Sequence, residues 1–335
     1  MVGAQAPLNP LITRPEVLAV GELVIGVDLG GTKIESVLAR RGAAEGSAPL
    51  EALARRRVPT HGDRGYRAVL DATADLVAAT AREAGLDLRD VPIGMGMPGG
   101  TTRVGSLVKN ANVVCLNGRP FRSDLEETLG RPLAFDNDAN CFALAETVLG
   151  AASAHRDGIV FGVILGTGVG GGLVVRGEVW PGAQGIAGEW GHHRAFVGEG
   201  ARPCYCGGRG CVERYLSGPA VEEEYARRCA HDGGDPHAPR LPLADIAARR
   251  GHDRHADAAI EELVDAFGRG LANVIAILDP SAIVLGGGVS NLELLYAEGI
   301  TRVARHVFND ELVTPILKHA LGDSAGVLGA ALIAR

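Results

Sequence analysis

Apolar runs that end in glycine-rich or polar turns recur along the chain, and they alternate with segments of helical periodicity. The apolar runs predict strands over residues 23–27, 34–39, 91–97, 132–135, 159–165, 173–175 and 281–285, with a last strand opening at 316. The helical pattern predicts helices over 66–84, from the polar segment after 135 through about 148, near 218–230, over about 257–278, about 292–307 and 326–333. Because strands and helices alternate, we expect an α/β protein with largely covered sheets.

Two segments combine a strand, a glycine-rich tip and a second strand. The tips are residues 28–33 (DLGGTK) and 166–172 (GTGVGGG). Backbone N–H groups at such a tip can converge on an anion because no Cβ atoms stand in the way. In the first tip, Asp28 could hold a magnesium ion, directly or through water, while Thr32 and Lys33 face phosphate oxygens. A tight hairpin without a ligand is the alternative for either tip, but two such tips in one chain favour phosphate binding.

The second tip also matches the glycine pattern of a dinucleotide-binding loop, G-x-G-x-x-G. That pattern indicates a nicotinamide cofactor only where the glycines open a helix within a strand–helix–strand unit. Here the apolar run 173–175 follows, with no signal for a helix start. We therefore expect no nicotinamide cofactor.

Length and composition exclude several classes of protein. A chain of 335 residues with 46% hydrophobic residues is too long for one ordinary core and predicts two domains. The net charge of -7, with no basic stripe, argues against a nucleic-acid partner. No apolar run approaches the roughly 20 residues that span a bilayer, so we expect no membrane partner.

The N-terminal segment, residues 1–20, contains three prolines and has its first positive side chain at Arg14. It lacks the charged and the apolar regions of a signal peptide, and we expect a disordered or loosely docked tail. Of the six cysteines, three are scattered in apolar contexts, which is typical of a reducing compartment rather than a disulfide scaffold. These features predict a cytoplasmic protein.

A short glycine-rich segment gathers four metal-binding side chains, His192, Cys204, Cys206 and Cys211. The close spacing of the cysteines is suited to one tetrahedral Zn²⁺, with the histidine as the fourth ligand. A disulfide, or thiols buried by chance, is the alternative. Four protein ligands close the coordination sphere, so the expected zinc is structural and holds its surroundings in place.

The segment from Asp136 to Asn140 (DNDAN) brings carboxylates and amides to the junction of a predicted strand and helix. Asp138 or Asn137 could serve as the helix N-cap. A carboxylate near a helix N-terminus is also favoured in its charged form, which suits a general base. Spacing alone leaves capping and catalysis equally open.

Eight motifs follow one another in the order expected of the ROK family of sugar kinases, which the chain resembles from residue 24 to about 330. They are DLGGTK, GMGMPGG, KNANVVCLNGRPF, DNDANCFALAE, ILGTGVGGG, GEWGHH, CYCGGRGCVERYLSGP and IVLGGGVSN. The resemblance implies an actin-like, hexokinase-type fold of two α/β lobes that close on Mg-ATP and sugar, in a homodimer. The smaller lobe would contain residues 21–138, with 320–335 returning to it, and the larger lobe residues 139–319.

The resemblance also implies roles for residues that match the family's motifs. Asp138 matches the catalytic aspartate, expected to act as the general base. His192 matches the zinc-binding histidine, which in the family also reaches a sugar hydroxyl. The implied sugar ligands are Asn112, Asn137, Glu189, His192 and Glu213. The implied nucleotide contacts are Asp28, Gly30, Gly31, Thr32 and Lys33 at the first tip, Gly166, Thr167 and Gly168 at the second, and Gly286, Gly287 and Gly288 beside the adenosine.

The implied activity is ATP-dependent phosphorylation of a hexose at its 6-hydroxyl. KNANVVCLNGRPF and GEWGH are most similar to the bacterial fructokinases of the family, so we expect D-fructose as the substrate. Kinases of glucose, mannose or N-acetylglucosamine are the alternatives. A repressor of the same family would need a helix-turn-helix in front of the first strand, where about 20 residues are too few. A zinc-binding module without catalysis would leave the two tips and DNDAN unexplained, and a non-catalytic sugar sensor is the remaining alternative.

Overall fold

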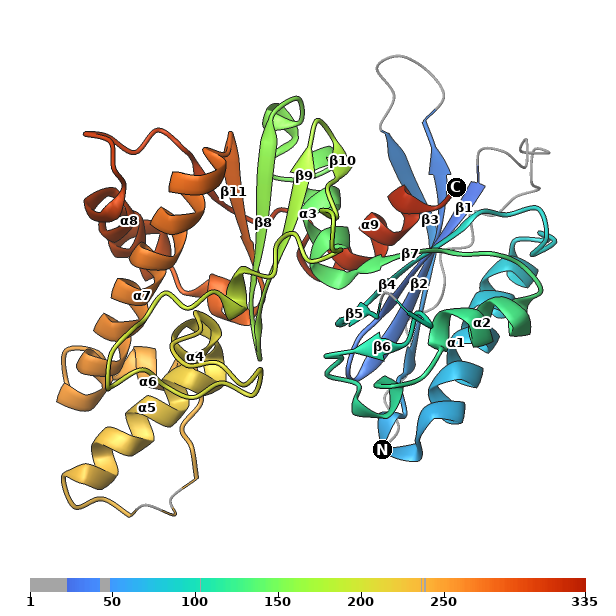
Figure 1. Cartoon of the computed structure of the whole chain (residues 1–335). Coiled ribbons are helices and arrows are strands. Elements are labelled where there is room, and N and C mark those ends of the chain that lie inside the picture. The colour runs from blue at the N-terminus through green and yellow to red at the C-terminus, as the bar shows by residue number, and fades with distance from the viewer. Residues whose placement is uncertain (1–22, 43–48, 103, 236, 238) are drawn as a thin grey trace.

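Two five-stranded sheets, each covered by helices, form the body of the protein (Figure 1). The computed structural model describes residues 23–42, 49–102, 104–235, 237 and 239–335. The predicted N-terminal tail lies outside these residues. Within them, no helix is both long and apolar enough to cross a membrane.

The first sheet has the strand order β3-β2-β1-β4-β7. Its strands are β1 (Leu23–Leu29), β2 (Lys33–Arg41), β3 (Leu50–Pro59), β4 (Ile93–Met97) and β7 (Ala134–Asn137). The strands β1, β2 and β3 pair in antiparallel fashion, whereas β4 and β7 run parallel to β1. Helices α1 (Tyr66–Glu83) and α2 (Phe121–Leu129) pack their apolar sides on this sheet. After β4 the chain forms a separate two-stranded hairpin of β5 (Gly100–Thr101) and β6 (Val108–Lys109).

The second sheet repeats this arrangement in the order β10-β9-β8-β11-β12. Its strands are β8 (Ile159–Leu165), β9 (Val169–Val175), β10 (Glu178–Val179), β11 (Ala282–Gly286) and β12 (Ile316–Lys318). Again an antiparallel hairpin comes first and two parallel strands follow. The outer helices are α4 (Glu213–Leu216), α5 (Gly218–His231), α6 (Leu243–Ala248), α7 (Arg254–Leu278) and α8 (Ile300–His306).

Two helices lie between the sheets, and each crosses from one sheet to the other (Figure 1). Helix α3 (Asp138–Val148) follows β7 of the first sheet but packs on β8 and β9 of the second. Helix α9 (Ala325–Ile333) follows β12 of the second sheet but packs on β1 and β4 of the first. The two helices also pack on each other, so closely that a Cβ at Gly329 would lie 1.9 Å from the carbonyl oxygen of Cys141. This crossing ties the two sheets into one molecule.

The predicted α/β class is confirmed, and every predicted strand and helix has a counterpart. The predicted extent of the second glycine tip is wrong, because β9 already begins at Val169. Glycine in β9 allows α3 to pack closely on the strand, since a Cβ at Gly172 would lie 2.5 Å from the backbone oxygen of Ala139 in α3. The helix expected from 292 begins at Leu295, with a π-helical turn ahead of α8. Strand β3 and helices α2, α4 and α6 were not predicted.

A buried carboxylate, Glu146 in α3, fastens the segment that leads into α9. Its two oxygens accept hydrogen bonds from the backbone N–H groups of Ala151 at 2.9 Å, Ala320 at 3.0 and 3.1 Å, and Leu321 at 2.9 Å. The residue is fully buried. Buried N–H groups need hydrogen-bond partners. This one side chain supplies them to the loop that follows α3 and to the segment that precedes α9.

We expect Glu146→Gln to destabilise the protein by about 1–3 kcal/mol, since an amide turns one acceptor into a donor that faces other donors. Thermal and urea unfolding followed by circular dichroism measure the change. The control is Glu127→Gln on the exposed side of α2, which should unfold like the wild type. Equal midpoints for the two variants would contradict a stabilising role for Glu146.

Candidate active site

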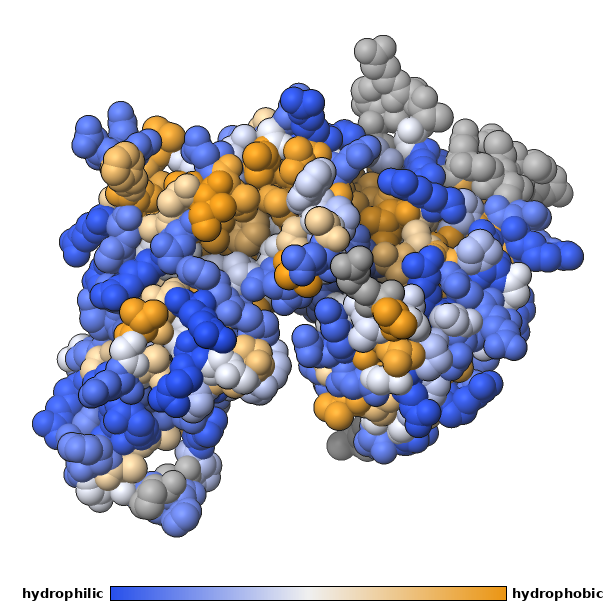
Figure 2. Space-filling model, viewed as in Figure 1, coloured by the Kyte–Doolittle hydropathy of each residue, from blue (hydrophilic) through white to orange (hydrophobic). Residues whose placement is uncertain are grey.

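A deep hollow separates the two halves of the molecule (Figure 2). It contains a cavity of about 860 Å³ and a smaller one of about 340 Å³. The larger cavity is lined from both halves, by 108–112 and 117–118 on one side and by 166–171 on the other. Asp138, Asn112, Pro98 and Ile164 line both cavities. The two spaces therefore meet at the N-terminus of α3.

The strand–helix junction fixes the side chains there. Asn137 is the N-cap of α3: its Oδ1 accepts from the Ala139 N–H at 2.8 Å, and its Nδ2 donates to the Gly99 carbonyl at 2.7 Å. Asp138 also accepts from the Ala139 N–H, at 2.9 Å. Capping is thus assigned mainly to Asn137, and one lone pair and one N–H of its amide are left over. The Asp138 carboxylate keeps its second oxygen for other partners.

Two buried carboxyl groups near this junction, Asp138 and Asp28, both have raised pKa values. Burial raises the pKa of Asp138 to about 6, and the charge of Glu189 adds to the rise, while the hydrogen bond from the Ala139 N–H opposes it. Burial raises the pKa of Asp28 to about 7, and the charge of Asp138 contributes. Asp28 lies at the end of β1 and lines the smaller cavity. A divalent cation would relieve this repulsion, so the pair suits a site for Mg²⁺.

The predicted nucleotide residues divide between the two cavities. Asp28, Gly30 and residues 286–288 line the smaller cavity, whereas residues 166–168 line the larger one. Gly31, Thr32 and Lys33 line neither; the Lys33 ammonium instead lies 3.2 Å from Oδ2 of Asp323. Contact of these three residues with phosphate stays a prediction.

All five predicted sugar ligands line the larger cavity. They are Asn112, Asn137, Glu189, His192 and Glu213. Glu213 opens α4, and its Oε2 accepts from the Val169 N–H at 3.0 Å. A Cβ at Gly168 would lie 2.8 Å from that same oxygen, so the glycine lets this carboxylate approach the tip. We call Glu189 and Glu213 the acidic wall of the cavity, and Glu213 packs this wall against the second glycine tip.

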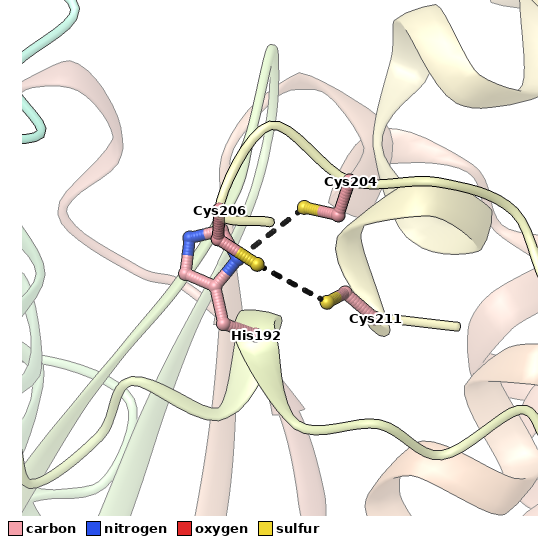
Figure 3. A group of neighbouring side chains, drawn as sticks. All are labelled: His192, Cys204, Cys206 and Cys211. Atoms are coloured by element: carbon pink, nitrogen blue, oxygen red, sulfur yellow. Dashed lines mark hydrogen bonds between the residues drawn. The ribbon is translucent and has the colours of Figure 1, made fainter. Parts of the chain in front are cut away.

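Four ligand-type side chains converge beside this wall, and we call His192, Cys204, Cys206 and Cys211 the knuckle. Figure 3 shows them pointing toward one another. Their ligand atoms all lie within 4.8 Å of one another. Nδ1 of His192 is 3.7 Å from Sγ of Cys204, and Sγ of Cys206 is 3.6 Å from Sγ of Cys211. Tetrahedral Zn²⁺ with Zn–S near 2.3 Å places its ligand atoms about 3.5–3.8 Å apart. The knuckle fits one zinc ion.

The alternative reading of the cysteines as a disulfide is not supported, because all three are free thiols. The loop reaches the required shape through two bridges, Arg194 with Cys211 and Pro203 with Arg209. Gly210 has a φ of +74°, and a Cβ there would lie 1.6 Å from the Phe196 carbonyl oxygen. Only glycine permits this closure.

Sequence reasoning missed several residues of the cavity walls. Lys109, Asn117 and Tyr205 line the larger cavity, and Asn291 and His319 line the smaller one. Four of them lie inside recognised motifs: Lys109 and Asn117 in KNANVVCLNGRPF, Tyr205 in CYCGGRGCVERYLSGP and Asn291 in IVLGGGVSN. His319 comes from a segment without a local signal, and the fold brings it to the site.

Comparison with known proteins agrees with the geometry. The pattern of the ROK family matches residues 24–335. The N-acetyl-D-glucosamine kinase of Vibrio vulnificus is 38% identical over 316 residues, which covers 92% of this chain and 98% of that protein. The ROK hexokinase of Thermus thermophilus superposes with a TM-score of 0.77 at 31% identity, covering 93% and 97% of the two chains.

A ROK family glucokinase from Streptomyces griseus, solved with glucose and AMPPNP, superposes with a TM-score of 0.72 at 31% identity. The alignment covers 93% of this chain and 99% of that one. The actin-like ATPase fold expected from the motifs is thereby confirmed. The chain belongs to the ROK family and is one of its sugar kinases.

Proposed function

We propose that this sugar kinase transfers the γ-phosphoryl group of ATP to the 6-hydroxyl of a hexose, with Asp138 as the general base. The observation that carries the proposal is the position of Asp138, which lines both cavities at their meeting point. A base at that point can face a sugar in the larger cavity while the nucleotide occupies the smaller one. The Streptomyces griseus relative, solved with glucose and AMPPNP, supports the binding of a sugar together with a nucleotide.

For the sugar, we propose N-acetyl-D-glucosamine as the first candidate. The expectation of fructose is not confirmed, because the relatives that match over 92% of the chain at 36–38% identity are N-acetyl-D-glucosamine kinases. Fructose remains the second candidate, supported by the resemblance of GEWGH and KNANVVCLNGRPF to fructokinases. Both candidates use the same fold, base and acidic wall.

In the proposed reaction, Asp138 accepts the proton of the 6-hydroxyl while that oxygen attacks the γ-phosphorus in line. A sugar hydroxyl is a poor nucleophile at neutral pH, so a positioned carboxylate is needed. The remaining work is positioning and charge stabilisation. Asp28 would hold Mg²⁺, which supplies positive charge to the phosphates, and the backbone N–H groups of the glycine tips would receive phosphate oxygens. Asn137 fixes the backbone on which Asp138 stands.

The acidic wall would bind the sugar hydroxyls. Ionised Glu189 and Glu213 only accept hydrogen bonds, and each can accept from more than one hydroxyl. The knuckle would hold a structural Zn²⁺, which keeps His192 and Glu213 in register. We further propose that the chain forms a homodimer, and that lobes of 21–138 with 320–335 and of 139–319 close around the sugar, which would exclude water from the transfer.

A coupled ADP-release assay with Mg-ATP tests the function directly. We expect turnover, with the highest kcat/KM for N-acetyl-D-glucosamine among this sugar, fructose, mannose and glucose. A clear preference for fructose would retain the kinase and its base but overturn the first candidate. No turnover with any of the four, in protein that contains zinc, would favour a non-catalytic sugar sensor.

We expect Asp138→Asn to lower kcat by roughly 10²–10⁴-fold with little change in sugar affinity, because the amide cannot accept the proton. Asp71→Asn on the surface of α1 is the control and should retain wild-type kinetics. Steady-state kinetics and calorimetric sugar binding give the two quantities. Wild-type turnover in the Asp138 variant would refute the assignment.

The same base predicts the pH profile. The carboxylate form of Asp138 prevails above its pKa of about 6, so kcat/KM should rise as the pH increases through this value and then level off. The residual activity of Asp138→Asn should lack this acidic limb. A wild-type profile that is flat from pH 5 to 8 would contradict a base with that pKa.

Removal of zinc with a chelator should abolish sugar binding while the nucleotide cavity, which contains no knuckle residue, still binds an ATP analogue. The reason is that His192 and Glu213 lose their fixed positions. Calorimetric titration with each ligand, together with metal analysis, measures the effect. Unaltered sugar affinity in zinc-free protein would disprove this role for the knuckle.

A further inference from the structure

Tyr205, between two cysteines of the knuckle, has no role in the reaction as derived so far. Its side chain lines the larger cavity together with Glu189, His192 and Glu213. Its hydroxyl oxygen lies 3.1 Å from Nε2 of His192, and the two rings meet edge to face with centroids 5.2 Å apart. The residue is nevertheless 72% exposed. A large aromatic side chain held in this way at the rim of a cavity is available to a ligand.

The knuckle would determine which of the two groups, His192 or Tyr205, donates this hydrogen bond. Nδ1 of His192 faces Sγ of Cys204 and the other ligand atoms. A ring nitrogen that binds a metal ion carries no hydrogen, so a neutral imidazole carries its hydrogen on the other nitrogen. With a zinc ion on Nδ1, Nε2–H would donate to the oxygen of Tyr205. A phenol hydroxyl can accept and donate at the same time, so its own hydrogen is left for another acceptor.

The wall around Tyr205 has acceptors in excess. Glu189 and Glu213, when ionised, accept hydrogen bonds and donate none. Sugar hydroxyl groups donate hydrogen bonds to such carboxylates, but the sugar oxygens can also accept hydrogen bonds and need a donor on the protein. A phenol hydroxyl beside the two carboxylates supplies that donor from the same wall.

We propose that Tyr205 is a substrate-binding residue whose hydroxyl, oriented by His192, donates a hydrogen bond to a sugar oxygen and contributes to the choice among hexoses. The proposal rests on the proposed function of the cavity. The flanking Cys204 and Cys206 are both ligands of the knuckle, so the backbone is fixed on each side of the tyrosine. Such a pre-organised side chain loses little conformational freedom on binding.

The variant Tyr205→Phe retains the ring and its edge-to-face contact with His192 but removes the hydroxyl. We expect KM for the preferred sugar to rise about fivefold, which corresponds to one hydrogen bond of about 1 kcal/mol. The kcat and the KM for ATP should stay within about twofold, because an interaction made equally in the ground and transition states affects KM alone. Calorimetric sugar affinity should fall by the same factor, and the preference over the other three hexoses should narrow.

The matched control is Tyr225→Phe. Tyr225 lines neither cavity, and its hydroxyl donates a hydrogen bond to Oδ2 of Asp253 at 2.7 Å. This variant should retain wild-type KM. Wild-type sugar affinity in Tyr205→Phe would overturn the proposal, and so would a loss of zinc from that variant, since the residue would then serve the knuckle alone. Wild-type protein that binds a sugar without turning it over would refute the kinase reaction, while the calorimetric comparison would still test Tyr205.

Discussion

The change of sheet between β7 and α3 is the constraint on which the site depends. Strand β7 ends in the first sheet at Asn137, and the next residue begins a helix that packs on the second sheet. Whatever side chain follows the cap must lie where the two halves of the molecule face each other. Asp138 occupies that position, so the topology of the backbone places the carboxylate that we propose as the general base.

The reciprocal crossing of α9 determines how the halves can move. The chain passes between them twice, into α3 and into α9, and these two helices pack on each other. Any relative motion of the sheets would therefore pivot near this helix pair, at the closed end of the hollow (Figure 2). The tight contact at Gly329 and the hydrogen bonds of Glu146 hold this helix pair together. The closure that we propose would therefore take place at the open end of the hollow.

The sequence predicted those elements that depend on neighbouring residues in the chain. The strand β1, the helix α1 and the cap at Asn137 follow from apolar pattern and capping chemistry, and the motifs located the knuckle and the carboxylates. Strand β3 was missed because LEALARRRVP is an exposed edge strand without regular alternation. The glycines from 170 to 172 were read as a turn, although contact with α3 and neighbouring loops explains them. Wall residues such as His319 carried no signal, since tertiary contacts alone bring them to a cavity.

The separation of chemistry from recognition explains why the motifs predicted the reaction better than the sugar. Asp138 and Asp28 belong to the junction and the first glycine tip, whereas the acidic wall comes from the segment around the knuckle. In that segment Glu189 precedes the histidine by three residues, and Glu213 follows the last cysteine by two. A zinc ion bound by the knuckle would hold both glutamates in place, whichever residues lie between the metal ligands. A substitution at such an intervening position would change the hydrogen-bond partners offered to the sugar and would leave the proposed base, the proposed metal site and the fold as they are. Resemblance in the ligand pattern therefore indicates the reaction more strongly than the hexose, because the side chains that the pattern leaves open would contribute to the choice of sugar.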